Sequence, residues 1–340
     1  MSAPGRYSRQ ELFAGIGVDG QQRIRAARVA VVGCGALGSA LAEMMVRAGA
    51  GAVTVIDRDY VEESNLQRQS LFDEDDAARG LPKAAAAEKR LKAINSEVTV
   101  RGVVADFAAD NAGELLRGDD LVLDGTDNFE TRFLLNDVCV KADIPWVYGA
   151  CVGSYGLVLL VRPHVTPCLR CVLEEMPGPG GPTCDTVGVV APVVHVVAGL
   201  QAAEALKLLT GRTEDLVPGV VSVDLWKNRF EVMDLGGRAP WCPACTEGRF
   251  DYLQAGTGTG SAVLCGRDAV QVRPPRGTRV DLPALAGRLS ASGDVAANEH
   301  LVRFRAPGTE MVVFGDGRAI VKGVKDAAQA RSIYARYVGS

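Results

Sequence analysis

A glycine-rich turn between a strand pattern and a helix pattern restricts the fold of this 340-residue chain more than any other feature. Residues 28–33 (RVAVVG) are an apolar run of strand length, and residues 36–48 follow with a helical pattern. Gly33, Gly35 and Gly38 form a Gly-x-Gly-x-x-Gly motif at the junction. Glycines at this spacing allow a tight turn and let backbone amides approach a phosphate at the helix N-terminus. The motif therefore predicts a nucleotide site on an α/β sheet.

The first half of the chain repeats this alternation of strand and helix patterns. Further strands are expected at residues 52–57, 98–104, 120–125 and 145–150, and further helices at 82–94 and 128–142. Strands that alternate with helices favour βαβ units around a parallel sheet. From Gly153 onward the apolar residues recur every second position, which favours an antiparallel extension. We therefore predict a doubly wound, Rossmann-like mixed sheet.

The composition of the second half suggests a domain boundary. Residues 162–188 are rich in Pro, Gly and Cys and show no periodicity, and a helix is expected to follow and end at Gly211. Residues 254–262 (QAGTGTGSA) have the composition of a linker. We predict a nucleotide-binding domain over residues 1–253, which includes a metal site, and a small α+β module over residues 262–340.

Acidic, basic and amide side chains follow the predicted strands at their carboxyl ends. Asp57 ends the second strand, where a carboxylate can accept hydrogen bonds from ribose hydroxyls; with the glycine motif alone, this would favour a nicotinamide-dependent dehydrogenase. However, Arg68 and Lys83 can neutralise a triphosphate, and Asp127 in the DGTDN segment can hold Mg²⁺. Arg68 and Lys83 could instead be surface charges, and Asp127 could be a helix N-cap. Their joint placement at the carboxyl edge of the sheet favours ATP chemistry.

Several motifs in order resemble the ubiquitin-activating-like adenylyltransferases, close to those that act on molybdopterin-synthase and thiazole sulfur carriers. The matching segments are RYSRQ (6–10), GCGALG (33–38), IDRDYVEESNLQRQ (56–69), LPKA (81–84), DGTDN (124–128), TRFLLN (131–136), CLRC (168–171), TCDTVGVV (183–190) and CPAC (242–245). The resemblance implies an enzyme that uses ATP to adenylate the C-terminal carboxylate of a small ubiquitin-like sulfur carrier ending in Gly-Gly.

The resemblance also implies roles for individual residues. The nucleotide site comprises Gly33, Gly35, Gly38, Asp57, Asp59, Asn65, Arg68, Lys83, Asp127 and Asn128. Arg9 is implied to cross the interface of a homodimer to the ATP of the partner subunit. Cys184 is implied to receive the activated acyl group or to exchange sulfur, although a spare loop cysteine is the alternative. The sulfur donor, a sulfurtransferase or a cysteine desulfurase, stays open.

Nine cysteines are present, and four of them form two Cys-x-x-Cys pairs, Cys168 with Cys171 and Cys242 with Cys245. Four thiolates can complete a closed tetrahedral zinc site, so we predict structural Zn²⁺. A redox-active pair is the rival interpretation. We expect Cys34, Cys139 and Cys151 to be small buried residues, and His195, on an apolar helix, to lie in the core. Cys265 is expected on a strand; the alternative is a persulfide carrier.

Composition excludes some classes of function. The net charge is only −4 and no basic stretch is typical of nucleic-acid binding. The N-terminus lacks an apolar signal core and no run of about 18 apolar residues is present. We therefore expect a cytoplasmic protein that binds neither nucleic acid nor membrane. The alternatives that remain are a nicotinamide- or flavin-dependent oxidoreductase and a non-catalytic nucleotide-binding adaptor.

Overall fold

The computed structural model describes residues 5–178, 184–254, 261–264, 269–275, 277–324 and 326–339. The chain divides into two compact units, residues 1–256 and 257–340. The interval that contains most of the predicted linker (255–260) lies outside the described residues. That the two units are separate domains stays a prediction.

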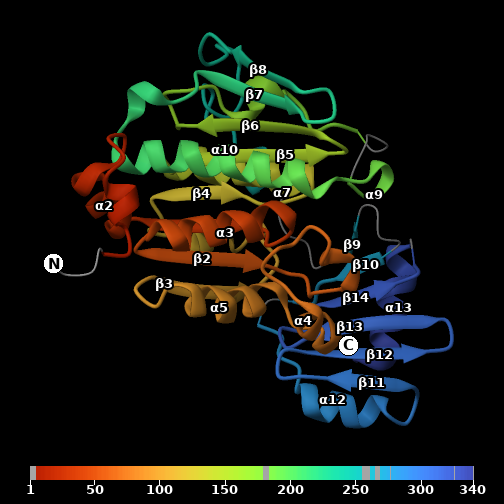
Figure 1. Ribbon diagram of the computed structural model, residues 1–340. Coiled ribbons are helices and arrows are strands. Elements are labelled where there is room, and N and C mark those ends of the chain that lie inside the picture. Colours follow the sequence, from red (N-terminus) through yellow and green to blue (C-terminus); the bar gives the residue numbers. More distant parts are fainter. Residues whose placement is uncertain are drawn as a thin grey trace. The chain divides into compact units, whose positions relative to one another are not determined.

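The first unit is built on an eight-stranded sheet with the strand order β3-β2-β1-β4-β5-β6-β7-β8 (Figure 1). The strands are β1 Arg28–Val32, β2 Ala52–Asp57, β3 Thr99–Val104, β4 Leu121–Asp124, β5 Trp146–Val152, β6 Tyr155–Val161, β7 Gly219–Asp224 and β8 Arg229–Asp234. The first five strands of that order run parallel, and β5 to β8 pair antiparallel. The predicted mixed, doubly wound sheet is therefore confirmed. Since the order reverses between β1 and β4, the ligand crevice of such a sheet is expected there.

Helices cover both faces of this sheet (Figure 1). On one face lie α3 Ala36–Ala48, α5 Lys83–Ile94 and α10 Ala191–Thr210; on the other lie α6 Ala112–Leu115, α7 Phe129–Ala142, α8 Leu169–Val172 and α11 Asp251–Gln254. Shorter elements complete the unit: α1 Ser8–Glu11, α2 Gly17–Ala26, η1 Glu63–Asn65, α4 Glu74–Arg79, α9 Cys184–Val187 and η2 Thr213–Asp215. Each face of the sheet thus has its own apolar core.

By length and composition, α10 is the one helix of the described residues that could cross a membrane. Half of its most apolar stretch is buried in the protein, and it packs against α3, β5 and β6. A core helix passes the same test. His195 nevertheless lies on the exposed side of α10, so the predicted core histidine is wrong. Because α10 is apolar on nearly all sides, the sequence did not reveal which side faces the sheet.

The second unit is a six-stranded antiparallel sheet with the order β11-β12-β13-β14-β10-β9 and two helices. Its elements are β9 Ser261–Leu264, β10 Ala269–Val272, α12 Leu282–Leu289, β11 Asp294–Ala297, β12 Leu301–Ala306, β13 Thr309–Phe314, β14 Ala319–Lys322 and α13 Ala327–Tyr337. The helices close an apolar core that includes Phe304 and Met311. The sequence analysis did not predict β11, whose four residues are mostly exposed and show no apolar alternation.

Candidate functional site

The glycine loop, residues 33–38, joins β1 to α3 and contacts the loop that follows β4. Gly33 has a φ of +85°, and a Cβ atom there would lie 2.7 Å from the carbonyl oxygen of Gly125. A Cβ atom on Gly38 would lie 1.8 Å from the carbonyl oxygen of Gly33. Protein packing therefore requires both glycines. Gly35 differs, because the nearest neighbour of its Cβ position is 3.9 Å away, which leaves room for a ligand at the start of α3.

Asp57 lies at the end of β2, directly beside the glycine loop. Its Oδ2 accepts a hydrogen bond of 2.5 Å from the Cys34 amide, and its Oδ1 accepts one of 2.6 Å from the Asp59 amide. Burial raises the pKa of the Asp57 carboxyl, while the positive charge of Lys83 opposes that rise. The carboxylate thus links the glycine loop to the segment after β2, and its contact with a ribose stays a prediction.

Lys83, the first residue of α5, is brought to the same edge by its contacts with Asp59. The Lys83 amide donates to the Asp59 carbonyl oxygen at 2.9 Å, and its Nζ lies 3.9 Å from Asp59 Oδ2. Lys83 is only 2% exposed, so the alternative of an ordinary surface charge is wrong for this residue. A buried ammonium beside carboxylates is suited to receive a phosphate group.

Asn65 and Arg68 lie in and just after η1. Asn65 is buried, and its Oδ1 accepts a hydrogen bond from the Glu62 amide at 3.1 Å, which caps η1. Half-buried Arg68 donates from Nη1 to the Ser64 carbonyl oxygen at 2.9 Å. Both residues thus have a structural role in this loop, and their contact with phosphate stays a prediction.

Asp127 and Asn128 belong to the aspartate loop, residues 125–128, between β4 and α7. The N-cap of α7 is Asn128, whose Oδ1 accepts from the Thr131 amide at 2.9 Å, so the alternative of Asp127 as N-cap is wrong. Asp127 is exposed. Burial lowers the pKa of the Arg132 guanidinium, but Asp124, and more weakly Tyr148 and Asp127, raise it overall. Asp127 is thus an exposed carboxylate at the carboxyl edge that does not cap α7, and its contact with a cation stays a prediction.

Sequence reasoning missed a set of buried polar side chains beneath the aspartate loop: Asp124, Arg132 and Gln201. Arg132 Nε lies 3.1 Å from Asp124 Oδ2, and Gln201 Nε2 donates to the Asp124 carbonyl oxygen at 3.0 Å. All three are less than a tenth exposed. The available signal was a charged or amide residue within an otherwise apolar segment, since such residues are rarely buried without a polar partner.

Arg9 lies far from the glycine loop of its own chain. Its helix, α1, is fixed at the C-terminal end of α3: Gln10 Nε2 donates to the Ala48 carbonyl oxygen at 3.0 Å, and Tyr7 packs on Gly49. The glycine loop is at the N-terminal end of α3, and the 13 residues of this helix span about 20 Å. The structure therefore does not bring Arg9 together with the other predicted site residues.

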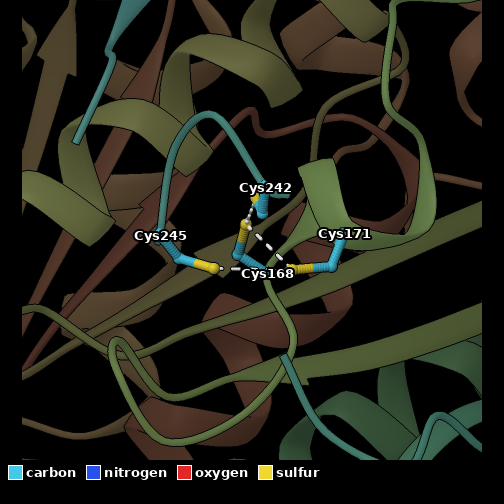
Figure 2. Close-up of side chains that lie close together, drawn as sticks. All are labelled: Cys168, Cys171, Cys242 and Cys245. Carbon is cyan, nitrogen blue, oxygen red and sulfur yellow. Dashed lines mark hydrogen bonds between the residues drawn. The ribbon is translucent and has the colours of Figure 1, made fainter. Parts of the chain in front are cut away.

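The cysteine knuckle, residues 168–171 and 242–245, brings the two Cys-x-x-Cys pairs together. Their four sulfur atoms point toward one another and lie within 4.8 Å of each other (Figure 2). The Sγ–Sγ distances are 3.9 Å for Cys168–Cys171, 3.6 Å for Cys168–Cys242 and 3.4 Å for Cys171–Cys245. A tetrahedral zinc–thiolate site has sulfur atoms about 3.8 Å apart. The donor set and its geometry fit zinc, with no position left open for a substrate.

The other cysteines are less informative. Cys34, Cys139 and Cys151 are buried as predicted, and burial raises the pKa of the Cys34 and Cys139 thiols, which makes them poor nucleophiles. Cys184 begins the short helix α9, but its side chain lies outside the described part of the structure. Cys265 lies outside the described residues altogether.

Comparisons with known proteins identify the family. The model of the ThiF family matches residues 7–244. Sulfur carrier protein ThiS adenylyltransferase of Bacillus subtilis (strain 168) is 52% identical over 337 residues, which are 98% of this chain and 99% of that protein. Sulfur carrier protein adenylyltransferase of Thermus thermophilus is 40% identical over 247 residues, 71% of this chain and 90% of that protein.

Solved structures agree with this assignment. The crystal structure of E. coli MccB with MccA-N7isoASN has a TM-score of 0.64 at 25% identity and covers 72% of this chain and 75% of that chain. The B. subtilis relative, by contrast, also matches the second unit, since its alignment includes 98% of this chain. The resemblance predicted from the motifs is confirmed: this chain belongs to the ThiF family.

Proposed function

We propose that this chain is an ATP-dependent adenylyltransferase that activates the C-terminal carboxylate of a small sulfur-carrier protein ending in Gly-Gly. The observation that carries the proposal is the arrangement at the carboxyl edge of the sheet, where Gly35, Asp57, Lys83 and Asp127 lie at or after the ends of β1, β2 and β4. Family membership and the name of the 52% identical relative, which acts on ThiS, support the same chemistry.

Each residue at this edge has a task that follows from its position. The glycine loop and the N-terminus of α3 receive phosphate oxygens, and Asp57 accepts hydrogen bonds from the ribose. Lys83 and Arg68, with Asn65 beside them, contact the phosphate chain and neutralise its charge. Asp127 is the residue of the aspartate loop that would hold Mg²⁺, which when bound offsets the charge of the phosphates.

The reaction needs little from the protein besides position and charge. The carrier carboxylate attacks the α-phosphorus, a new C–O–P linkage forms and pyrophosphate leaves with the bond electrons. The product is an acyl adenylate, which a thiolate or persulfide can attack. The carboxylate is already ionised at neutral pH, so no general base is required.

The two alternatives explain less of this arrangement. A nicotinamide- or flavin-dependent oxidoreductase needs the glycine loop and Asp57, but it does not need Lys83 buried beside Asp59 or an exposed Asp127. A nucleotide-binding adaptor could lose these charges without penalty. We therefore favour the adenylyltransferase, with Zn²⁺ as a structural ion in the cysteine knuckle.

The position of Arg9 supports a homodimer with composite sites. Because α1 packs at the opposite end of α3 from the glycine loop, about 20 Å along that helix, we expect Arg9 to meet ATP in a second subunit. Apolar side chains are exposed nearby, with Leu12 73% and Phe13 65% exposed on the segment after α1. Large exposed apolar patches are typical of protein interfaces.

Mixing two inactive variants tests the composite site. If Arg9 acts in the partner's site, co-refolded Arg9→Ala and Asp127→Ala chains form mixed dimers with one complete site, and about one quarter of the wild-type activity returns. Full activity of Arg9→Ala alone, or no recovery on mixing despite dimers in gel filtration, would contradict this part of the proposal.

The proposal extends to the transfer of sulfur, the biosynthetic pathway and the location of the protein in the cell. We expect Cys184 to take part in acyl or sulfur transfer, with a sulfurtransferase or cysteine desulfurase as partner. Thiamine synthesis is favoured over molybdopterin synthesis, because the relative that matches nearly the whole chain is named for ThiS. A cytoplasmic location stays a prediction.

ATP–pyrophosphate exchange tests the activity. We expect exchange that depends on a ThiS-like carrier and that is absent with the same carrier truncated by its final glycine. Asp127→Ala should lower the exchange rate about 100-fold or more, because an ion that screens leaving pyrophosphate is lost. Asp75→Ala, which removes an exposed surface carboxylate, is the matched control and should retain full exchange. Exchange without any carrier, or none with any carrier, would reject the proposal.

A further inference from the structure

The backbone pairing between β4 and β5 stops just before the aspartate loop. The strands pair only at Val122–Trp146 and Leu123–Val147, although β5 continues to Val152. Buried backbone groups at such a split need other partners, because an unpaired buried polar group costs free energy. Two side chains from opposite faces of the sheet supply them.

Gln201 enters the split from α10. Its Nε2 donates to the Asp124 carbonyl oxygen at 3.0 Å and to the Val147 carbonyl oxygen at 3.1 Å, so one amide group links β4 to β5. Gln201 is fully buried. The space for it depends on Gly149, where a Cβ atom would lie 2.3 Å from the Gln201 amide group.

Arg132 enters from the other face, on α7. Its Nε binds Asp124 Oδ2 at 3.1 Å, and its Nη2 donates to the carbonyl oxygens of Thr126 at 2.7 Å and Gly149 at 2.9 Å. Asp124 Oδ1 in turn accepts from the Thr126 amide at 2.9 Å and the Thr126 hydroxyl at 2.7 Å. One guanidinium thus connects β4, the aspartate loop and β5.

These contacts end one residue before Asp127. Thr126, which Arg132 and Asp124 hold at three atoms, precedes Asp127 in the chain, while Asn128 is fixed as the N-cap of α7. Asp127 is itself exposed. Its backbone is therefore fixed on both sides while its side chain is exposed to solvent, as a preorganised cation ligand requires.

We infer that Arg132 and Gln201 are positioning residues that brace the β4–β5 split and thereby hold Asp127 in place. The inference rests on the proposed function in one respect, the task of Asp127 in holding Mg²⁺. The bracing of the aspartate loop by these two side chains does not depend on that function. Lysine cannot replace Arg132, because a single ammonium lacks the planar set of donors that reaches three acceptors at once.

Hydrogen–deuterium exchange and enzyme kinetics together test the brace. In Arg132→Lys and in Gln201→Met, we expect amides of residues 125–128 to exchange at least about 10-fold faster, while those of β1 and α3 keep their rates. Gln201→Met nearly preserves size and removes the amide group, of which only Nε2 makes hydrogen bonds, so it carries the test if Arg132→Lys does not fold. Arg47→Lys, at an exposed arginine on α3, is the matched control and should change neither the amide exchange rates of residues 125–128 nor the enzyme kinetics.

The kinetic readout separates positioning from folding. Both variants should raise the Mg²⁺ concentration that gives half-maximal ATP–pyrophosphate exchange about fivefold or more, an effect that a lower amount of folded enzyme does not produce. The inference would be overturned if the amides of residues 125–128 exchanged hydrogen at the wild-type rate in the folded variants. It would also be overturned if these amides exchanged faster while the Mg²⁺ concentration for half-maximal ATP–pyrophosphate exchange stayed unchanged. If wild type lacks exchange activity with every carrier, the proposed function fails, and the deuterium data alone decide whether the brace exists.

Discussion

The glycine loop and the cysteine knuckle differ in what holds their shape. In the glycine loop, backbone packs on backbone: the Gly33 amide donates to the Ile56 carbonyl oxygen and the Gly125 amide to the Val32 carbonyl oxygen, each at 2.8 Å. In the knuckle, the backbone-to-backbone hydrogen bonds stay within each turn, as from the Cys171 amide to the Cys168 carbonyl oxygen at 3.0 Å, and the two turns meet at their sulfur atoms. The backbone alone therefore shapes the first region, whereas we expect the second to depend on a bound ion.

Removal of zinc should have the largest effect on stability, because it acts on the knuckle and leaves the glycine loop unchanged. Purified protein is expected to contain stoichiometric zinc, and chelation should lower the free energy of unfolding of the first unit by on the order of 5 kcal/mol, because binding and folding of the knuckle are linked. Metal analysis and denaturant unfolding measure both. Cys139→Ala removes a buried thiol outside the knuckle and should keep its zinc. A metal-free protein with unchanged stability would contradict the account.

Substitution of the two kinds of glycine should have opposite consequences. Gly38→Ala places a methyl group against the Gly33 carbonyl oxygen and should cost at least about 3 kcal/mol, since backbone cannot yield as a side chain can. Gly35→Ala meets open space and should cost no more than about 1 kcal/mol while it weakens ATP binding. Thermal unfolding and ATP titration distinguish the two. Equal stabilities would show that packing does not define this loop.

A buried carboxyl next to the knuckle should make the stability of the first unit depend on pH. Asp137 on α7 accepts from the Tyr252 amide at 2.9 Å, next to the segment that follows the second cysteine pair, and burial raises the pKa of its carboxyl to about 6. A raised folded-state pKa favours the protonated folded form, so this contribution to stability is present below about pH 4 and is lost as the pH rises to about 6.

Asp137→Asn should therefore become more stable than wild type by on the order of 2 to 3 kcal/mol as the pH rises through that window. Unfolding curves at pH 4 and pH 7 for both proteins give this difference. Asp75→Asn, at an exposed position, is the control and should follow wild type at both values. A difference that does not grow with pH would show that folding does not raise the pKa of the Asp137 carboxyl.

Local patterns predicted much of the first unit. Apolar runs predict strands, glycines predict helix ends, and the motif of Gly33, Gly35 and Gly38 predicts a tight turn. Each of these features depends only on residues close together in the sequence, so the sequence pattern reveals it. The sheet, the glycine loop and the pairing of the cysteines into one cluster could all be predicted in this way. Position at the carboxyl edge likewise followed from the order of strands for Asp57, Lys83 and Asp127.

Long-range contacts could not be predicted. The brace joins Asp124, Arg132 and Gln201 from β4, α7 and α10, and no local pattern indicates that these three meet. His195 was placed in the core because α10 is apolar, but a helix apolar on nearly all sides does not reveal its orientation. The distance of Arg9 from its own site likewise follows only from the packing of α1 on the far end of α3.

Trapping of the acyl adenylate with hydroxylamine would show directly whether the enzyme activates the carrier carboxylate. A ThiS-like carrier ending in Gly-Gly is incubated with the enzyme, ATP, Mg²⁺ and hydroxylamine, and the carrier is examined by intact mass and peptide sequencing. Adenylation of the carboxylate predicts a hydroxamate on the final glycine, formed with wild type and lost with Asp127→Ala. A carrier left unmodified by the wild-type enzyme, or modified anywhere other than its C-terminus, would contradict the account.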